Sequence, residues 1–129
     1  MVTVAARADP VDALRDVLLE ARPLDDRRRN EWLVWIAFWS TAVHSEPMRK
    51  EHVGRYREWE ELLAQLVRNV AAHRIGRWDG LDATDEAVRL SALIDGLGLR
   101  MTLGREGDGA ERAIAAIDRH LGTLGIHAG

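Results

Sequence analysis

The chain has 129 residues, a hydrophobic fraction of 47% and a formal net charge of −3. This length fits one domain with its own core. The absence of cysteine excludes disulfides, thiolate catalysis and cysteine-ligated zinc. The basic cluster at residues 27–29 is offset by acidic neighbours, so no nucleic-acid surface is expected. Because no signal peptide or bilayer-long apolar run is recognisable, we expect a cytoplasmic protein.

The first part of the chain predicts two helices that are separated by a proline. Pro10 suits the first turn of a helix over about residues 10–21, with Asp9 as its N-cap. Pro23 separates this helix from a second one over about residues 25–44. No part of the chain shows the period-two alternation of a strand. The fold expected is therefore all-α, with about five or six helices.

The second predicted helix is rich in aromatic residues, with three of the five tryptophans and the only phenylalanine. One arc of about 120° on this helix is apolar and is formed by Trp32, Trp35, Ile36, Trp39, Ala42 and Val43. Other apolar residues cover much of the opposite side, so we expect protein to surround the helix. Core packing explains such a helix, and so does the lining of a cavity for an apolar guest.

The third predicted helix is long, over about residues 46–73, and starts at the Ser45–Pro47 segment. Its apolar face is formed by Val53, Tyr56, Trp59, Leu62, Leu63, Leu66, Val67 and Val70. His52 projects from the same arc, one turn before Tyr56. It is either a polar group at the mouth of a pocket or a partly exposed histidine near a helix start.

The fourth predicted helix, over about residues 82–103 with Asp82 or Thr84 as its cap, has two apolar faces. One is formed by Leu90, Leu93, Ile94, Leu97 and Met101, and the other by Val88, Ala92, Gly96, Leu99 and Leu103. One face can serve the core of the domain, and the second requires another partner. A fifth, amphipathic helix is predicted over about residues 110–124.

No arrangement of residues typical of catalysis is present. The serines lack the context of a nucleophile elbow, and no glycine loop is suited to hold a phosphate. The histidines lack a common spacing, so the sequence predicts neither a metal site nor another cofactor. An enzyme is therefore not expected, although a small helical enzyme that uses His52, Tyr56 and a carboxylate is the least favoured alternative.

Two segments carry a family resemblance. WLVWIAFWSTAVHSEPMRKEHVGRYREWEELLAQLV (32–67) and DATDEAVRLSALIDGLGLRMTL (82–103) resemble the C-terminal regulatory domain of TetR-type transcriptional repressors. The branch that handles betaine and related ligands is the most similar one. The AFW segment, the SEP helix start, the Tyr56/Trp59 helix and the Asp95-Gly96-Leu97 triplet carry most of the likeness, which covers about residues 10–124.

The resemblance implies an all-helical domain that binds a small effector among its central helices. With the aromatic pattern it points to a hydrophobic or cationic effector, held by Trp32, Trp35, Phe38, Trp39, His52, Tyr56, Trp59 and Leu63. Effector binding in such repressors is transmitted to an N-terminal helix-turn-helix domain. Residues 1–9 are too short to contain one, so we expect no direct DNA binding by this chain.

The resemblance also implies a homodimer in which the last two helices pair as a four-helix bundle. The interface residues expected are Val88, Ala92, Asp95, Gly96, Leu99, Arg100, Leu103, Ala113, Ile117, His120, Leu121 and Leu124. The Asp95 carboxylate is expected either to pair with an arginine across the dimer or to make a buried hydrogen bond. Residues 1–9 and 125–129 are expected to be frayed. The main alternative function is an interaction protein that forms mixed dimers with an intact repressor.

Overall fold

A computed structural model describes residues 9–73, 81–104 and 109–125. Within these ranges the structure is all-α and contains no strand, as the sequence predicted. The helices are α2 (Pro10–Glu20), α3 (Asp26–Ala42), α4 (Glu46–His73), α5 (Ala83–Leu103) and α6 (Ala110–Thr123). The ends predicted to fray lie outside the described residues, except for Asp9 and Gly125.

Aspartates begin the helices where the sequence predicted caps. The Asp9 carboxylate accepts a hydrogen bond from the backbone N–H of Val11 at 2.8 Å. The Asp82 carboxylate accepts from the N–H groups of Thr84 and Asp85 at 3.0 and 3.1 Å. Each cap satisfies backbone donors that the first helical turn leaves unpaired. The cap of α5 is therefore Asp82 and not Thr84.

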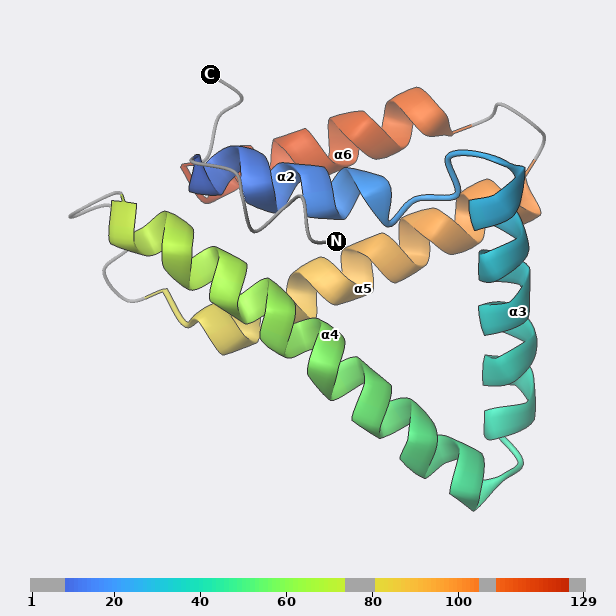
Figure 1. The fold of residues 1–129 in the computed structure, drawn as a ribbon. Helices are drawn as coiled ribbons and strands as arrows, with labels where there is room; N and C mark the ends of the chain where they lie inside the picture. The colour runs from blue at the N-terminus through green and yellow to red at the C-terminus, as the bar shows by residue number, and fades with distance from the viewer. Residues whose placement is uncertain (1–8, 74–80, 105–108, 126–129) are drawn as a thin grey trace.

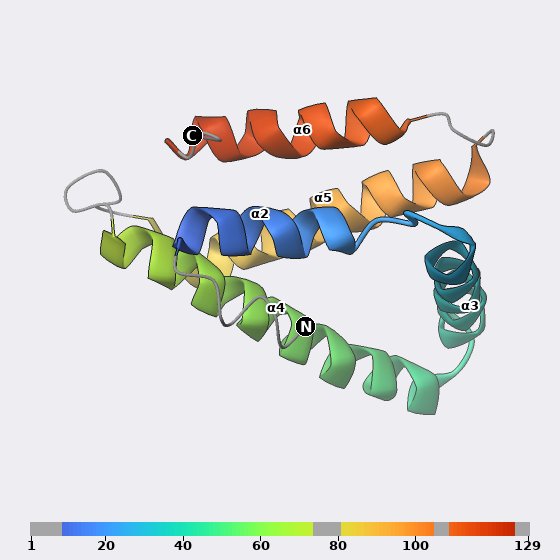
Figure 2. The ribbon, with the colours of Figure 1, turned by 45° about the horizontal axis from the view of Figure 1, so that its top comes forward.

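The core lies where α4 packs against α5 and α2, with α6 beside α2 and α5 (Figures 1 and 2). It is built from one apolar stripe of each of these helices. The apolar residues of the described ranges with no exposed surface are Leu14, Leu18, Leu63, Val67, Val70, Ala87, Leu90 and Ile117. Their burial supplies the main favourable free energy of folding. None of the helices in the described part of the chain is long and apolar enough to span a bilayer.

Helix α3 crosses the others steeply at one end of the molecule (Figure 1). Its only buried residue is Ala42, and the side chains of Leu33 and Val34 are 44% and 69% exposed. The expectation that protein surrounds this helix is thus wrong for the single chain. The physical reason is its position, because α4 and α5 pack against one side of α3 and leave the other side open.

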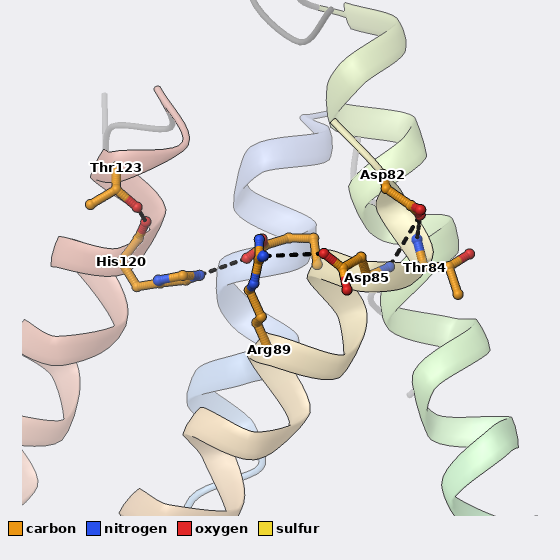
Figure 3. Close-up of polar contacts among 7 residues, drawn as sticks. Asp82, Thr84, Asp85, Arg89, His120 and Thr123 are labelled. Atoms are coloured by element: carbon orange, nitrogen blue, oxygen red, sulfur yellow. Dashed lines mark hydrogen bonds and ion pairs between the residues drawn. The ribbon is translucent and has the colours of Figure 1, made fainter. Parts of the chain in front are cut away.

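Polar contacts with α2 and α5 help to attach α6 to the rest of the domain. The Arg15 guanidinium of α2 donates two hydrogen bonds to the Asp118 carboxylate, at 2.7 and 3.0 Å. On α5 the fully buried Glu86 carboxylate lies 2.6 Å from His120 Nε2 and 3.4 Å from Arg89 Nη1. Figure 3 shows His120 reaching across from α6 to this group. A buried carboxylate is stable only with such partners.

Candidate functional site

A cavity of about 530 Å³ lies between the end of α2 and helices α3, α4 and α5. In Figure 1 these last three helices form the sides of a triangle. The cavity is lined by Glu20, Ala21, Arg22, Arg28, Glu31, Trp32, Trp35, Trp39, Arg55, Tyr56, Glu58, Trp59, Leu62, Ile94 and Asp95. Its volume is in the range of small-molecule sites. Its lining of many aromatic rings with a few polar groups is also typical of such sites.

Trp32 forms the wall of the cavity next to α2 and α5. Its indole N–H donates to the Ala21 carbonyl at 2.9 Å, and its ring meets the Trp39 ring edge-on at 6.2 Å between centroids. A Cβ at Gly98 would lie only 2.1 Å from two carbons of the Trp32 ring. The glycine therefore makes the space in which this ring lies. A glycine inside a helix lowers its stability by about 1 kcal/mol relative to alanine, and here it provides room for an indole ring.

Trp35, Phe38, Trp39, His52 and Tyr56 form one connected cluster of rings. Trp35 meets Phe38 edge-on at 5.9 Å, and the His52 ring lies 4.2 Å from the Tyr56 ring. His52 also contacts Trp39 at 6.3 Å. Such edge-to-face contacts fix the orientation of the rings, so several of them present π-faces or edges to the same cavity.

One Trp35 face already receives a cation, because the Arg55 guanidinium carbon lies 5.4 Å from its centroid. Arg55 is also paired with Glu51 at 3.2 Å. This contact demonstrates that a positive group fits against the rings of this cluster.

Asp95 is the deepest acidic group of the cavity. The Tyr56 hydroxyl donates a hydrogen bond to its carboxylate. Burial raises the pKa of Asp95, while the hydrogen bond from Tyr56 and the nearby His52 oppose that shift. Burial and the contact with Asp95 also raise the pKa of Tyr56, so the phenol stays protonated. The hydrogen bond from Tyr56 is partly buried, and no arginine of the same chain pairs with Asp95 in the described ranges. The pairing of Asp95 with an arginine across a dimer stays a prediction.

Most of the predicted effector residues lie on this cavity. Those that line it are Trp32, Trp35, Trp39, Tyr56 and Trp59. Phe38 and His52 do not line it and instead pack against the lining rings. Leu63 is fully buried in the core, and its neighbour Leu62 lines the cavity. The charged lining residues were not anticipated, since nothing in one helix reveals which polar flanks a neighbouring helix will face.

The predicted dimer residues differ in how exposed they are in the single chain. An exposed stripe on α5, hereafter the α5 stripe, consists of Val88, Ala92, Gly96, Leu99 and Leu103. Arg100 beside it is exposed, and Leu124 is partly buried. Three others are buried inside the chain's own core or against it, namely Ala113, Ile117 and Leu121. Asp95 and His120 have the partners within the chain that are described above.

The described residues contain no group of three or more histidine, aspartate or glutamate side chains arranged to hold a metal ion. The polar groups of the cavity suit non-covalent recognition, with ring faces for a cation, one half-buried carboxylate and several guanidinium groups.

Comparison with known proteins gives one consistent family. Residues 10–125 match the family described as "BetI-type transcriptional repressor, C-terminal". The chain is similar to the HTH-type transcriptional regulator BetI of Paraburkholderia xenovorans (strain LB400), with 34% identity over 106 residues, 79% of this chain and 49% of that protein. It is 36% identical over 104 residues to BetI of Burkholderia cenocepacia (strain HI2424), covering 78% and 48%.

The chain thus spans about half the length of the curated relatives it matches. No solved structure matches it. The family is one of transcriptional regulators and not of enzymes. Because the family match covers nearly all of the described helices, the chain belongs to the BetI-type branch of the TetR transcriptional repressors and represents their C-terminal regulatory domain.

Proposed function

We propose that this domain senses a small cationic effector in the aromatic cavity and pairs with a second copy through the α5 stripe. The observation that carries the effector proposal is the combination of five aromatic side chains with Asp95 in one cavity. Ring faces attract a cation through their quadrupole, and a desolvated site strengthens this attraction. A purely hydrophobic effector is the alternative, and the half-buried Asp95 carboxylate argues against it.

The carboxylate supports a cation because its own partners do not neutralise it. Asp95 accepts from the neutral Tyr56 hydroxyl, and burial raises its pKa. A cationic effector beside Asp95 would compensate this partly desolvated charge on binding. The desolvated Asp95 charge destabilises the ligand-free domain. Its compensation by a cation would therefore add to the binding free energy of the effector.

The α5 stripe supports the dimer. Its five positions recur at intervals of three or four residues, so they share an arc of about 80° on the helix. Val88 is 46% exposed, Leu99 37% and Leu103 66%. An exposed apolar strip of this length is a liability unless another surface covers it. A second copy supplies an identical strip, which a two-fold axis brings face to face.

The mechanism proposed is a population shift between helix arrangements. The effector would contact α3 and α4 through the rings and α5 through Asp95, so it would bind one arrangement of these helices best. Helix α5 also carries the α5 stripe, so a change at the cavity would reach the dimer interface directly. In a full-length regulator, acting in the cytoplasm, this change would alter operator binding by the DNA-binding domain.

A matched pair of probes tests the cation proposal. The cation 2-hydroxyethyl-trimethylammonium and its uncharged isostere 3,3-dimethylbutan-1-ol have the same shape and differ in charge. Tryptophan fluorescence of the domain should change saturably with the cation and much less with the isostere. Equal responses would show that the cavity does not select positive charge.

Three variants locate the response. Asp95→Asn keeps a hydrogen-bond acceptor for Tyr56 and removes the negative charge. It should therefore weaken binding of the cation and leave binding of the isostere unchanged. Asp85→Asn on the exposed first turn of α5 is the matched control and should leave the affinities for the cation and for the isostere unchanged. The double replacement Trp39→Ala/Trp59→Ala should abolish the response in a protein that circular dichroism shows to be helical.

A further inference from the structure

Asp95 is a half-buried carboxylate without a permanent counter-ion. It lies where α4 crosses α5, and the Tyr56 hydroxyl donates a hydrogen bond to it. Within the described ranges it forms no ion pair with a lysine, arginine or histidine side chain. Its only described hydrogen-bond donor is therefore neutral, so no fixed positive partner holds the carboxylate in its charged form.

Several charged and titratable groups surround Asp95. On α4 the nearby His52 favours the ionised carboxylate through its charge, and Glu60 favours the protonated one. The other charged residues that line the cavity come from the end of α2, from α3 and from α4, and are Glu20, Arg22, Arg28, Glu31, Arg55 and Glu58. None of these six bonds to Asp95 within the part of the chain that the structure describes. Two of the arginines have carboxylate partners of their own.

A proton and a cation have opposite effects on this carboxylate. Burial raises the pKa of Asp95, so the ligand-free domain holds a proton here to a higher pH than an exposed aspartate does. A cation placed against the same group favours the ionised carboxylate and lowers its affinity for the proton. By thermodynamic linkage, the proton must then lower the affinity for the cation by the same factor.

We propose that a proton and the cationic effector compete for Asp95, so that acid weakens the response of the domain to its effector. When the effector binds the protonated form, the O–H bond of the Asp95 carboxyl breaks. The proton leaves to the solvent, and the carboxylate then faces the cation. This inference rests on the proposed cation site and adds its regulation by pH.

The test measures proton release by the wild-type domain. A pH-stat records the base that keeps an unbuffered solution of the domain at constant pH while 2-hydroxyethyl-trimethylammonium chloride is added. Tryptophan fluorescence gives the affinity at each pH. From about pH 7 down to about pH 4, the protons released per bound cation should rise toward one. Over the same range the affinity should fall, with a limit of about tenfold per pH unit.

Two additions serve as controls that need no variant. The uncharged isostere 3,3-dimethylbutan-1-ol does not compensate a carboxylate, so it should release no protons. Sodium chloride at the same ionic strength should also release none, because it does not occupy the cavity. Equal proton release by the isostere and the cation would overturn the competition.

Variants then assign the released proton to one side chain. Asp95→Asn should abolish both the proton release and the pH dependence of the affinity, and Asp85→Asn on the exposed first turn of the same helix should retain both. Release that persists in Asp95→Asn would come from another group, such as His52, and would overturn the proposal. If Asp95→Asn does not fold, carbon NMR of the wild-type Asp95 carboxyl replaces it. The cation should move the titration midpoint of this carboxyl to lower pH, and an unmoved midpoint would overturn the proposal.

Failure of the competition can be told apart from failure of the cation site. If the cation binds more tightly than the isostere at about pH 7 but releases no proton and keeps one affinity at every pH, the competition is wrong and the cation site stands. If the cation binds no more tightly than the isostere, the cation site and the competition both fail.

Discussion

The packing of Trp32 on Gly98 permits a sharp prediction, because one added methyl group tests how the cavity wall is built. In Gly98→Ala the new Cβ would lie 2.1 Å from the Trp32 ring, far inside van der Waals contact. The ring is rigid and is held by the 2.9 Å hydrogen bond to the Ala21 carbonyl. It must therefore leave its position, or α5 must move away from α3.

The expected cost follows from three contributions. Overpacking of this kind destabilises by about 1–3 kcal/mol, and the loss of the indole hydrogen bond adds about 1 kcal/mol. The higher helix propensity of alanine stabilises the folded state by about 1 kcal/mol relative to glycine and offsets part of this loss. The free energy of unfolding of Gly98→Ala should thus fall by about 1–3 kcal/mol in total, and the saturable fluorescence response should weaken.

Urea unfolding followed by circular dichroism measures this change, with all variants at one protein concentration. Gly54→Ala is the matched control, since a Cβ at that exposed position in α4 meets nothing within 4 Å. It should raise the free energy of unfolding by up to about 1 kcal/mol. If Gly98→Ala is as stable as this control, Trp32 does not pack on Gly98 as described.

Three other changes test separate parts of the structure. Gly96→Leu on the α5 stripe should weaken the dimer in light scattering, and an unchanged dimer would remove Gly96 from the interface. Burial raises the pKa of Asp95, so the folded protein keeps its proton to higher pH than the unfolded chain does, and stability falls as pH rises through the raised pKa. Asp95→Asn should remove this fall in urea midpoints measured from about pH 4 to 7, and an unaltered pH profile would contradict the assignment. His120→Ala leaves the buried Glu86 with Arg89 alone at 3.4 Å and should lower the free energy of unfolding by about 1–3 kcal/mol; no loss would show that the pair does not stabilise α6.

The helices were predictable because their signals are local. Asp9 and Asp82 cap α2 and α5 through contacts that span two or three residues. The two apolar faces of α5 follow from spacing along one helix, and the structure buries or half-buries the residues of one face and exposes those of the other. Short-range hydrogen bonds and helical periodicity are both encoded in consecutive residues.

The polar part of the cavity was not predictable in the same way. Arg22 follows the end of α2, where no periodicity applies, and its burial depends on how α2 meets α3. The pairing of Tyr56 with Asp95 depends on the crossing of α4 and α5. The exposure of Leu33 and Val34 reflects the position of α3 at the end of the molecule. Such features are set by packing angles between helices, which no single segment specifies.

The most direct test of the cation cavity is a nuclear Overhauser measurement in solution with 2-hydroxyethyl-trimethylammonium. The proposal predicts cross-peaks between the ligand methyl protons and the ring protons of Trp32, Trp39, Tyr56 and Trp59, which are lost in Trp39→Ala/Trp59→Ala. A bound ligand whose methyl protons show cross-peaks only to residues away from these rings, or no binding at all, would contradict it.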